Sequence, residues 1–266
     1  MDCDQRCDFT GNYERSYLPA VKALERDVLG CDYGGTSWTT RDQASNIASF
    51  LDLNSSSSLL EVGSGAGWPG LYLSSMTGCE VTLLDMPLIA LKQAAERAAR
   101  DDMVKYVRLV NGNGTALPFA DESFNCISHS DVLCCLPDKF ELLRECRRVV
   151  TTSGRMHFSV IRPSDGLSPA DHQRAVETGP PFVDAPEGYS RLLQESGWRI
   201  ADRVDISAEY GSCLENLVAG LKANTPALRD VYGAHELRDL WRHRAEQYRL
   251  VRLGILQREA FSLIAA

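Results

Sequence analysis

The chain has 266 residues, 44% of them hydrophobic and 24% charged, which is the composition of an ordinary globular protein with a sizeable core. Its formal net charge of −8 argues against nucleic acid as the main partner, because proteins that bind nucleic acid generally carry a basic surface. No apolar run approaches the ~20 residues needed to span a bilayer, and the first ten residues lack the features of a secretory signal. We therefore expect a cytoplasmic protein with no membrane partner.

Cysteine and histidine usage points away from disulfides and metal. The nine cysteines are an odd number, contain no CxxC pair and fall mostly in apolar segments, so we expect free buried thiols. The histidines show no metal-ligand spacing, and we expect no metal site.

Two helices are expected before the first strand. Apolar residues recur at helical spacing over residues 17–30 and 39–53, and a turn rich in glycine and aromatic residues joins the two segments. We interpret residues 1–55 as an N-terminal helical lid. The serine run at 54–58 is interpreted as a linker between this lid and the first strand.

From Ser58 onward, predicted strands and helices alternate. The expected strands are 59–62, 80–84, 106–110, 124–128 and 155–161, and the expected helices are 69–77, 87–100 and 139–149. Such alternation predicts a parallel sheet with helices on both faces, because each crossover needs a helix to return the chain. Gly154 is expected to end the helix before the strand at 155–161.

The remaining chain is expected to complete this sheet and to cover one edge of it. Residues 162–188 are rich in proline and glycine and predict a long loop with at most one short helix. A helix at 189–196, a strand at 198–206, a helical stretch at 212–253 and a closing strand at 257–266 should come after this loop. We therefore divide the chain into a lid (1–55), a core (56–206), a helical cap insertion (207–253) and a closing strand (254–266).

The stretch "LLEVGSGAGWPG", residues 59–70, places a glycine-rich turn after the first strand. We expect free backbone amides and a helix N-terminus at the carboxyl edge of that strand, where open α/β sheets bind ligands. Asp85 ends the next strand, 22 residues after Gly63, at a distance typical of an acid that binds the ribose hydroxyls of a nucleoside. A dinucleotide turn would need glycine at position 68, where this chain has the bulky Trp68.

The glycine spacing and the preceding Glu61 instead match the E/DxGxGxG motif of class I S-adenosylmethionine-dependent methyltransferases. "VTLLD", "NGNGTALPFADESFNCI", "HSDVLCCLPD" and "LLRECRRVVTTSGRMHFSVI" come next, in the order found in the ubiquinone/menaquinone-biosynthesis-like group of small-molecule methyltransferases. The chain resembles that group over roughly residues 45–161. The resemblance implies a Rossmann-like α/β fold with a seven-stranded sheet of order 3-2-1-4-5-7-6, the last strand antiparallel, and S-adenosyl-L-methionine as cofactor.

The resemblance also implies roles for individual residues. Asp85 would bind the ribose hydroxyls, Met86 would pack on the adenine, and the amide oxygen of Asn113 would accept from the adenine amino group, where the family usually has aspartate. The full set of implied cofactor-binding residues is Gln43, Glu61, Gly63, Gly65, Asp85, Met86, Asn113, Gly114, His129 and Ser130. A purely structural interpretation stays open for several positions: Gly67 and Gly70 would permit close packing, Met86 would be core, and Asp131 would cap a helix.

Catalysis of methyl transfer depends mainly on alignment and desolvation, so the sequence need not contain a catalytic dyad. In this fold the residues after the fourth strand face the transferred methyl, and they include His129, Ser130, Asp131 and Cys134. We consider His129 and Tyr33 as catalytic candidates. The candidate substrate contacts are Tyr33, Trp38, Asp131 and Cys134.

We expect a methyltransferase that acts on a small-molecule acceptor. A homodimer stays an option. Two other classes remain open: an NAD-linked oxidoreductase and a non-catalytic nucleoside-binding protein.

Overall fold

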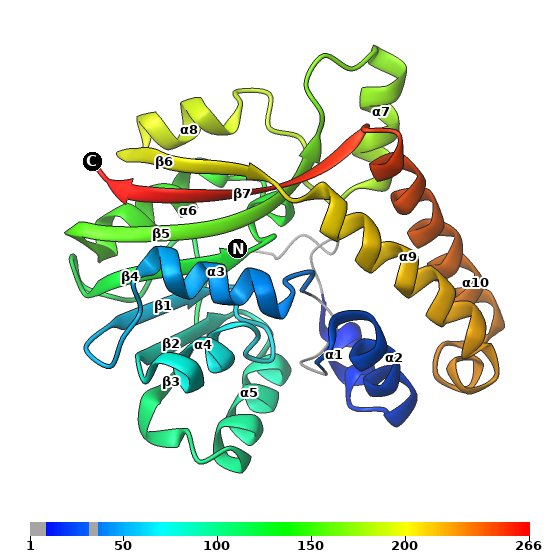
Figure 1. Cartoon of the computed structure of the whole chain (residues 1–266), viewed down its shortest axis with the longest axis horizontal. Coiled ribbons are helices and arrows are strands. Elements are labelled where there is room, and N and C mark those ends of the chain that lie inside the picture. Colours follow the sequence, from blue (N-terminus) through cyan, green and yellow to red (C-terminus); the bar gives the residue numbers. More distant parts are fainter. Residues whose placement is uncertain (1–8, 32–36) are drawn as a thin grey trace.

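A seven-stranded mixed sheet runs through the centre of the molecule (Figure 1). The computed structural model describes residues 9–31 and 37–266. The strand order is β3-β2-β1-β4-β5-β7-β6, in which β7 runs antiparallel to both of its neighbours and the other pairings are parallel. The expected fold and strand order are confirmed. The strands are β1 Ser58–Val62, β2 Glu80–Asp85, β3 Val107–Asn111, β4 Phe124–Ser130, β5 Val150–Pro163, β6 Trp198–Asp205 and β7 Leu256–Ala265.

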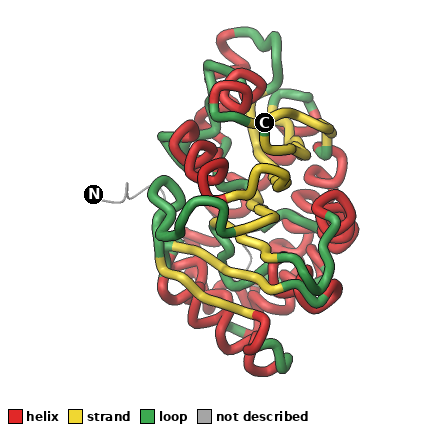
Figure 2. Tube along the Cα trace, turned by 90° about the vertical axis from the view of Figure 1, so that its left-hand side faces the viewer, coloured by secondary structure: helices red, strands yellow, loops and turns green. Residues whose placement is uncertain are grey.

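Helices cover both faces of the sheet (Figure 2). The α-helices are α1 Thr10–Ser16, α2 Pro19–Leu29, α3 Arg41–Leu51, α4 Gly70–Thr77, α5 Leu88–Arg100, α6 Lys139–Val149, α7 Pro169–Thr178, α8 Tyr189–Glu195, α9 Ser207–Ala223 and α10 Thr225–Arg252. One apolar cluster joins α3, α4 and α5 to β1 and β2, and a larger one joins α6 and α8 to the other face of the sheet. Burial of these apolar side chains is the main favourable contribution to folding.

Helices α1 and α2 lie beyond the carboxyl ends of the parallel strands, whereas α3 packs on a face of the sheet (Figure 1). In α1, Tyr13 packs against Ala66 of the glycine turn and Ala90 of α5. In α2, Val21 and Leu24 pack in one apolar cluster with residues of α9 and α10. The two short helices therefore bridge α5 to the cap and form a roof over the glycine turn.

The cap consists of α9 and α10, which pack against each other and project beyond the strands (Figure 1). This helical region begins at Ser207, five residues earlier than expected from the sequence. Gly233 interrupts α10 with a non-helical backbone (φ 74°, ψ 164°), which glycine adopts without steric cost.

Two local expectations differ from the structure. Helix α1 was not predicted, and it is only seven residues long. Strand β5 begins directly after α6, at Val150, so Gly154 lies inside the strand rather than at a helix end. The loop at 162–188 contains one helix, the ten-residue α7, as expected, and it packs against α10 and β5.

Other expectations can be checked only for the described residues. Within residues 9–31 and 37–266, six of the seven cysteines are buried, as predicted. No helix in these ranges is both long and apolar enough to cross a bilayer. The division into lid, core and cap as separate units stays a prediction.

Candidate functional site

The glycine turn after β1 is tied closely to the end of β2. The backbone N–H groups of Gly63 and Ser64 both donate to the Leu84 carbonyl, at 2.8 and 3.1 Å. The next glycine amide, that of Gly65, donates to the carboxylate Oδ2 of Asp85 at 2.6 Å. The expectation that these amides are free for a ligand is therefore wrong. Gly63 and Gly65 have positive φ values of 67° and 53°, which favour glycine, and a Cβ on Gly63 would collide with Val132.

Asp85 orders this edge through both of its oxygens. Oδ2 accepts from Gly65, and Oδ1 accepts from the N–H of Met86 at 2.7 Å. Burial raises the pKa of this carboxyl group, and the two backbone donors oppose that rise. Each carboxylate oxygen has a second lone pair, so the group can accept further hydrogen bonds from a ligand.

Glu61 is fully enclosed and accepts a hydrogen bond from the first residue of α4. Its Oε2 accepts from the N–H of Gly70 at 2.8 Å, and the side chain is 1% exposed. Burial raises the pKa of Glu61 to about 8, with a further rise from the nearby Asp85 charge. Glu61 therefore positions the turn from below and does not face a ligand. Gly70 must be glycine, because a Cβ there would collide with the Glu61 carboxyl group.

The indole of Trp68 is buried. It lies in the apolar cluster with Leu71 and Leu73, and its Nε1 donates to the Thr39 carbonyl at 2.7 Å. Trp68 thus joins the glycine turn to the segment that precedes α3.

Gln43 lies in the first turn of α3 and has one free donor group. Its Oε1 accepts from the backbone of Thr40 in a capping box and from Arg258 at 3.1 Å. Its Nε2 is buried and has no hydrogen-bond partner among the described residues. Buried amide groups are normally satisfied, so this donor is available to a ligand.

Arg258 on β7 is the main feature that the sequence analysis missed. The side chain is 0% exposed, and its Nε and Nη2 bind the two oxygens of Asp131 at 3.0 and 2.9 Å. Such a side-on, two-point pair is the strongest geometry for arginine and carboxylate. Asp131 does not cap a helix; it has a φ of 57° and comes directly after β4.

The remaining donors of Arg258 fix the segment before α3. Nη1 donates to the Trp38 carbonyl at 3.0 Å, and Nη2 donates to the Thr39 hydroxyl at 3.2 Å. Nη2 also donates to the Ser159 hydroxyl of β5 at 2.9 Å. One buried guanidinium therefore joins β4, β5, β7 and the segment between α2 and α3.

The residues that the resemblance assigns to adenine, Met86 and Asn113, differ in exposure and in hydrogen bonding. Met86 is 45% exposed and so is not core, and its backbone is held by Asn111. The Oδ1 of Asn113 already accepts from the N–H and the hydroxyl of Thr115, so the expected acceptor for adenine is occupied. Gly114 packs closely, because a Cβ there would collide with Leu142.

The residues at the end of β4 are less accessible than expected. His129 is 1% exposed, it stacks on Phe158, and neither ring nitrogen has a hydrogen-bond partner in the described part of the chain. Burial lowers the pKa of His129 to about 3, and this enclosure argues against the hypothesis that it is a general base. Cys134 is also fully buried, with its thiol donating to the Asp131 carbonyl, so it does not line an open site. Ser130 is partly exposed and accepts from the Thr39 hydroxyl.

Of the two lid aromatics, only Trp38 can be placed. Its ring contacts Tyr210 edge to face, with 5.1 Å between centroids, and the Arg244 guanidinium lies 5.3 Å from its centroid. Trp38 therefore lies at the junction of lid, sheet and cap. Tyr33 lies outside the described residues.

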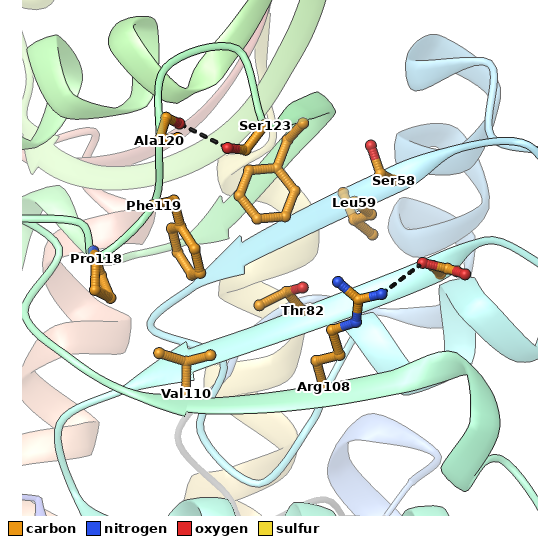
Figure 3. A pocket seen from close by; sticks show the side chains of 11 residues that line it. Ser58, Leu59, Thr82, Arg108, Val110, Pro118, Phe119, Ala120 and Ser123 are labelled. Atoms are coloured by element: carbon orange, nitrogen blue, oxygen red, sulfur yellow. Dashed lines mark hydrogen bonds and ion pairs between the residues drawn. The ribbon is translucent and has the colours of Figure 1, made fainter.

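A hollow of about 330 Å³ lies elsewhere, on the sheet face beside the β3–β4 connection (Figure 3). Thr82, Arg108 and Val110 line its floor, and Pro118, Phe119 and Ser123 line the opposite side. It includes the starts of β1 and β2 rather than their carboxyl ends, so we do not assign it to the cofactor. Among residues 9–31 and 37–266, no group of three or more potential ligands is placed to hold a metal ion.

Comparison with known proteins identifies the central part of the chain. Residues 60–158 match the family described as "Methyltransferase domain". The chain is 27% identical over 165 residues to the 27-O-demethylrifamycin SV methyltransferase of Amycolatopsis mediterranei. This match covers 60% of this chain and 61% of that protein. It is 34% identical over 101 residues to the ubiquinone/menaquinone biosynthesis C-methyltransferase UbiE of Legionella pneumophila, covering 37% of this chain and 40% of that protein.

A solved structure agrees with these matches at the level of the fold. A putative sarcosine dimethylglycine methyltransferase from Galdieria sulphuraria superposes with a TM-score of 0.76 and 18% sequence identity. The match covers 83% of this chain and 82% of that one. The chain spans less than two thirds of the length of both sequence relatives named above.

The enclosure of Glu61 leads to a prediction with two substitutions. If the group is neutral at pH 7, Glu61→Gln should preserve the hydrogen bond from Gly70, whereas Glu61→Ala should lose about 1–3 kcal/mol of stability by leaving that N–H unpaired. Urea unfolding at pH 7 measures both. If Glu61→Gln is as damaging as Glu61→Ala, the site uses the carboxylate charge.

The buried ion pair leads to a second prediction. Arg258→Met should lower the free energy of unfolding by about 3–5 kcal/mol, because Asp131 is left as an uncompensated buried charge. Adding Asp131→Asn to this variant should restore part of the loss. Arg249→Met, on the exposed side of α10, is the control. Simple additivity of Arg258→Met and Asp131→Asn would contradict a direct coupling.

His129 leads to a prediction about acid stability. Its pKa of about 3 in the folded state lies below the ordinary value of about 6.5, so the unfolded state takes up the proton first and stability falls as the pH drops below 6.5. We expect His129→Leu to remove about 1 kcal/mol of the stability difference between pH 7.5 and 5.5, measured by urea unfolding at both values. Met76→Leu, at an exposed position without a titratable side chain, is the control and should leave the difference unchanged.

Proposed function

We propose that this chain, a class I S-adenosylmethionine-dependent methyltransferase, transfers a methyl group from S-adenosyl-L-methionine to a small-molecule acceptor. The observation that carries this proposal is the pairing of the glycine-rich turn with Asp85 at the carboxyl edge of the sheet, inside the matched methyltransferase domain. The comparisons give no support to an NAD-linked oxidoreductase or a silent nucleoside-binding protein.

In this proposal the cofactor lies across the carboxyl ends of β1, β2 and β4. Asp85 accepts from the ribose hydroxyls with its unused lone pairs, and the exposed Met86 packs on the adenine. The unpartnered Nε2 of Gln43 donates to the carboxylate of the cofactor's amino-acid portion. The amide nitrogen of Asn113, rather than its occupied oxygen, is the group left for adenine.

When bound, the sulfonium of the cofactor supplies an activated methyl group, and the contribution of the protein is alignment and exclusion of water. The Arg258–Asp131 pair holds the end of β4 and the Trp38–Thr39 segment in one fixed arrangement. The lid helices α1 and α2 close the region from the side of α5 and the cap. No proton transfer by His129 is needed if the acceptor atom is unprotonated.

Several finer statements remain predictions. These are the small size of the acceptor, the lack of a nucleic-acid partner, a homodimer, and the cytoplasmic location.

A cofactor-binding measurement tests the proposal. Calorimetry should detect S-adenosyl-L-methionine at micromolar affinity and no comparable binding of NADH. Asp85→Ala should weaken cofactor binding by about 2 kcal/mol, roughly 30-fold, because the hydrogen bonds to the ribose are lost. Asp101→Ala, which removes an aspartate that pairs with the exposed Arg100, is the matched control and should not change the affinity.

A methyl-transfer screen completes the test. Pooled metabolites with labelled cofactor should yield a labelled product with the wild-type chain and far less with Asp85→Ala. Unchanged affinity in Asp85→Ala, or tight binding of NADH in place of S-adenosyl-L-methionine, would contradict the proposed role.

A further inference from the structure

The cap contains an arginine whose strongest binding edge is empty. Arg244 on α10 donates through Nη1 to Gln247 Oε1 at 2.6 Å, and Gln247 is itself oriented by donating to the Thr178 carbonyl. Nε of Arg244 is buried without a partner, and no hydrogen bond joins Nη2 to any residue that the structure describes. The Nε–Nη2 edge is the edge with which Arg258 holds Asp131.

No carboxylate in the described ranges compensates this charge. Neighbouring arginines of the same region have acidic partners: Arg15 pairs with Glu236, and Arg174 and Arg249 both pair with Glu246. Across residues 9–31 and 37–266, Arg244 forms no ion pair within 4.0 Å. Asp131, on the sheet nearby, is already bound at both oxygens by Arg258. Arg244 is partly exposed, but its Nε is buried with no acceptor, which is costly, so such an edge is retained where it binds an anion.

The second unused group beside Arg244 is the hydroxyl of Tyr210. Tyr210 on α9 is 0% exposed, and its hydroxyl has no hydrogen-bond partner among the residues that the structure describes. Burial raises its pKa, while the charges of Arg244 and Arg258 act in the opposite direction. The hydroxyl therefore lies within electrostatic reach of both arginines.

Trp38 connects this pair of groups to the end of β4. Its ring lies under the Arg244 guanidinium and against Tyr210, and its carbonyl accepts from Arg258. The unfilled arginine edge is thus placed beside the segment that closes over the site, on the cap side.

We propose that the methyl acceptor carries an oxyanion, a carboxylate or a phosphate, which binds side-on to Nε and Nη2 of Arg244 and accepts from the hydroxyl of Tyr210. This inference rests on the proposed function. It adds a substrate class: acidic small molecules rather than neutral ones. Arginine suits this task because its planar fork matches the two oxygens of such a group.

The test uses the full chain saturated with S-adenosylhomocysteine, and two probes, sodium phosphate and sodium acetate, against sodium chloride at equal ionic strength. One of the two probes should raise the melting temperature of the wild-type chain, and the preferred probe distinguishes phosphate from carboxylate. Arg244→Gln should weaken the apparent affinity for that probe at least tenfold. Arg249→Gln, an exposed arginine of the same helix that already has an acidic partner, should match the wild type.

Two further variants separate binding from a structural role. Tyr210→Phe should weaken the affinity for the probe a few-fold and leave the fold unchanged. Arg244→Lys should retain part of that affinity. Without any probe, Arg244→Gln should melt at or above the wild-type temperature, because it removes an uncompensated charge. A lower melting temperature of this variant together with an unchanged probe effect would show that Arg244 is only structural and overturn the inference.

The experiment gives different results if this inference fails and if the proposed function fails. If neither phosphate nor acetate exceeds chloride in the wild type while S-adenosylhomocysteine still binds, the acceptor is not acidic and the methyltransferase proposal stands. If S-adenosylhomocysteine and S-adenosyl-L-methionine do not bind at all, the proposed function fails and this inference fails with it.

Discussion

The buried Arg258 guanidinium is the interaction on which the arrangement of the site depends. It lies on the last strand, yet it binds the carboxylate that comes after β4, a hydroxyl on β5 and three groups between residues 38 and 43. Removing a charge of this kind from water is costly, and two hydrogen bonds to Asp131 offset that cost only when both partners are present. The closing strand therefore holds the N-terminal segment in place over the carboxyl edge of the sheet.

In the proposed site the amides of Gly63, Ser64 and Gly65 are occupied by groups of the protein. Gly65 donates to Asp85 and Gly70 donates to Glu61, so the glycine turn does not act as an anion site. In the proposed function the turn lets the cofactor approach closely, with the Asp85 carboxylate and the unpartnered Nε2 of Gln43 available to it. Such a set suits a ligand with ribose hydroxyls and an amino-acid end better than one with a pyrophosphate.

Much of the fold could be predicted because its causes are local in the sequence. Alternating strands and helices from Ser58 onward predicted the sheet, and the strand order came from the family resemblance. Glu61, Gly65 and Asp85 could be singled out because the glycine turn and the end of the next strand have a fixed spacing. The accessibility of individual side chains could not be predicted: His129 and Cys134 lie at or just after the end of the expected strand but are turned into the core.

The roles of Arg258 and Arg244 could not be predicted from the sequence, because they depend on contacts with residues that are distant along the chain. Arg258 and Asp131 are separated by 127 residues, and nothing near Arg258 marks it as buried. Arg244 looks like one charge among several on an exposed helix, and only the ion pairs of its neighbours show that its own edge is unfilled. Long-range polar contacts of this kind are set by tertiary packing and not by local propensity.

The most direct test of the account is a crystal structure of the chain with S-adenosylhomocysteine. We expect the ribose hydroxyls against the Asp85 carboxylate, the amino-acid carboxylate against Nε2 of Gln43, and the Arg258–Asp131 pair intact. A nucleoside bound instead in the hollow beside Thr82 and Arg108, with the carboxyl edge of β1 and β2 empty, would contradict the account.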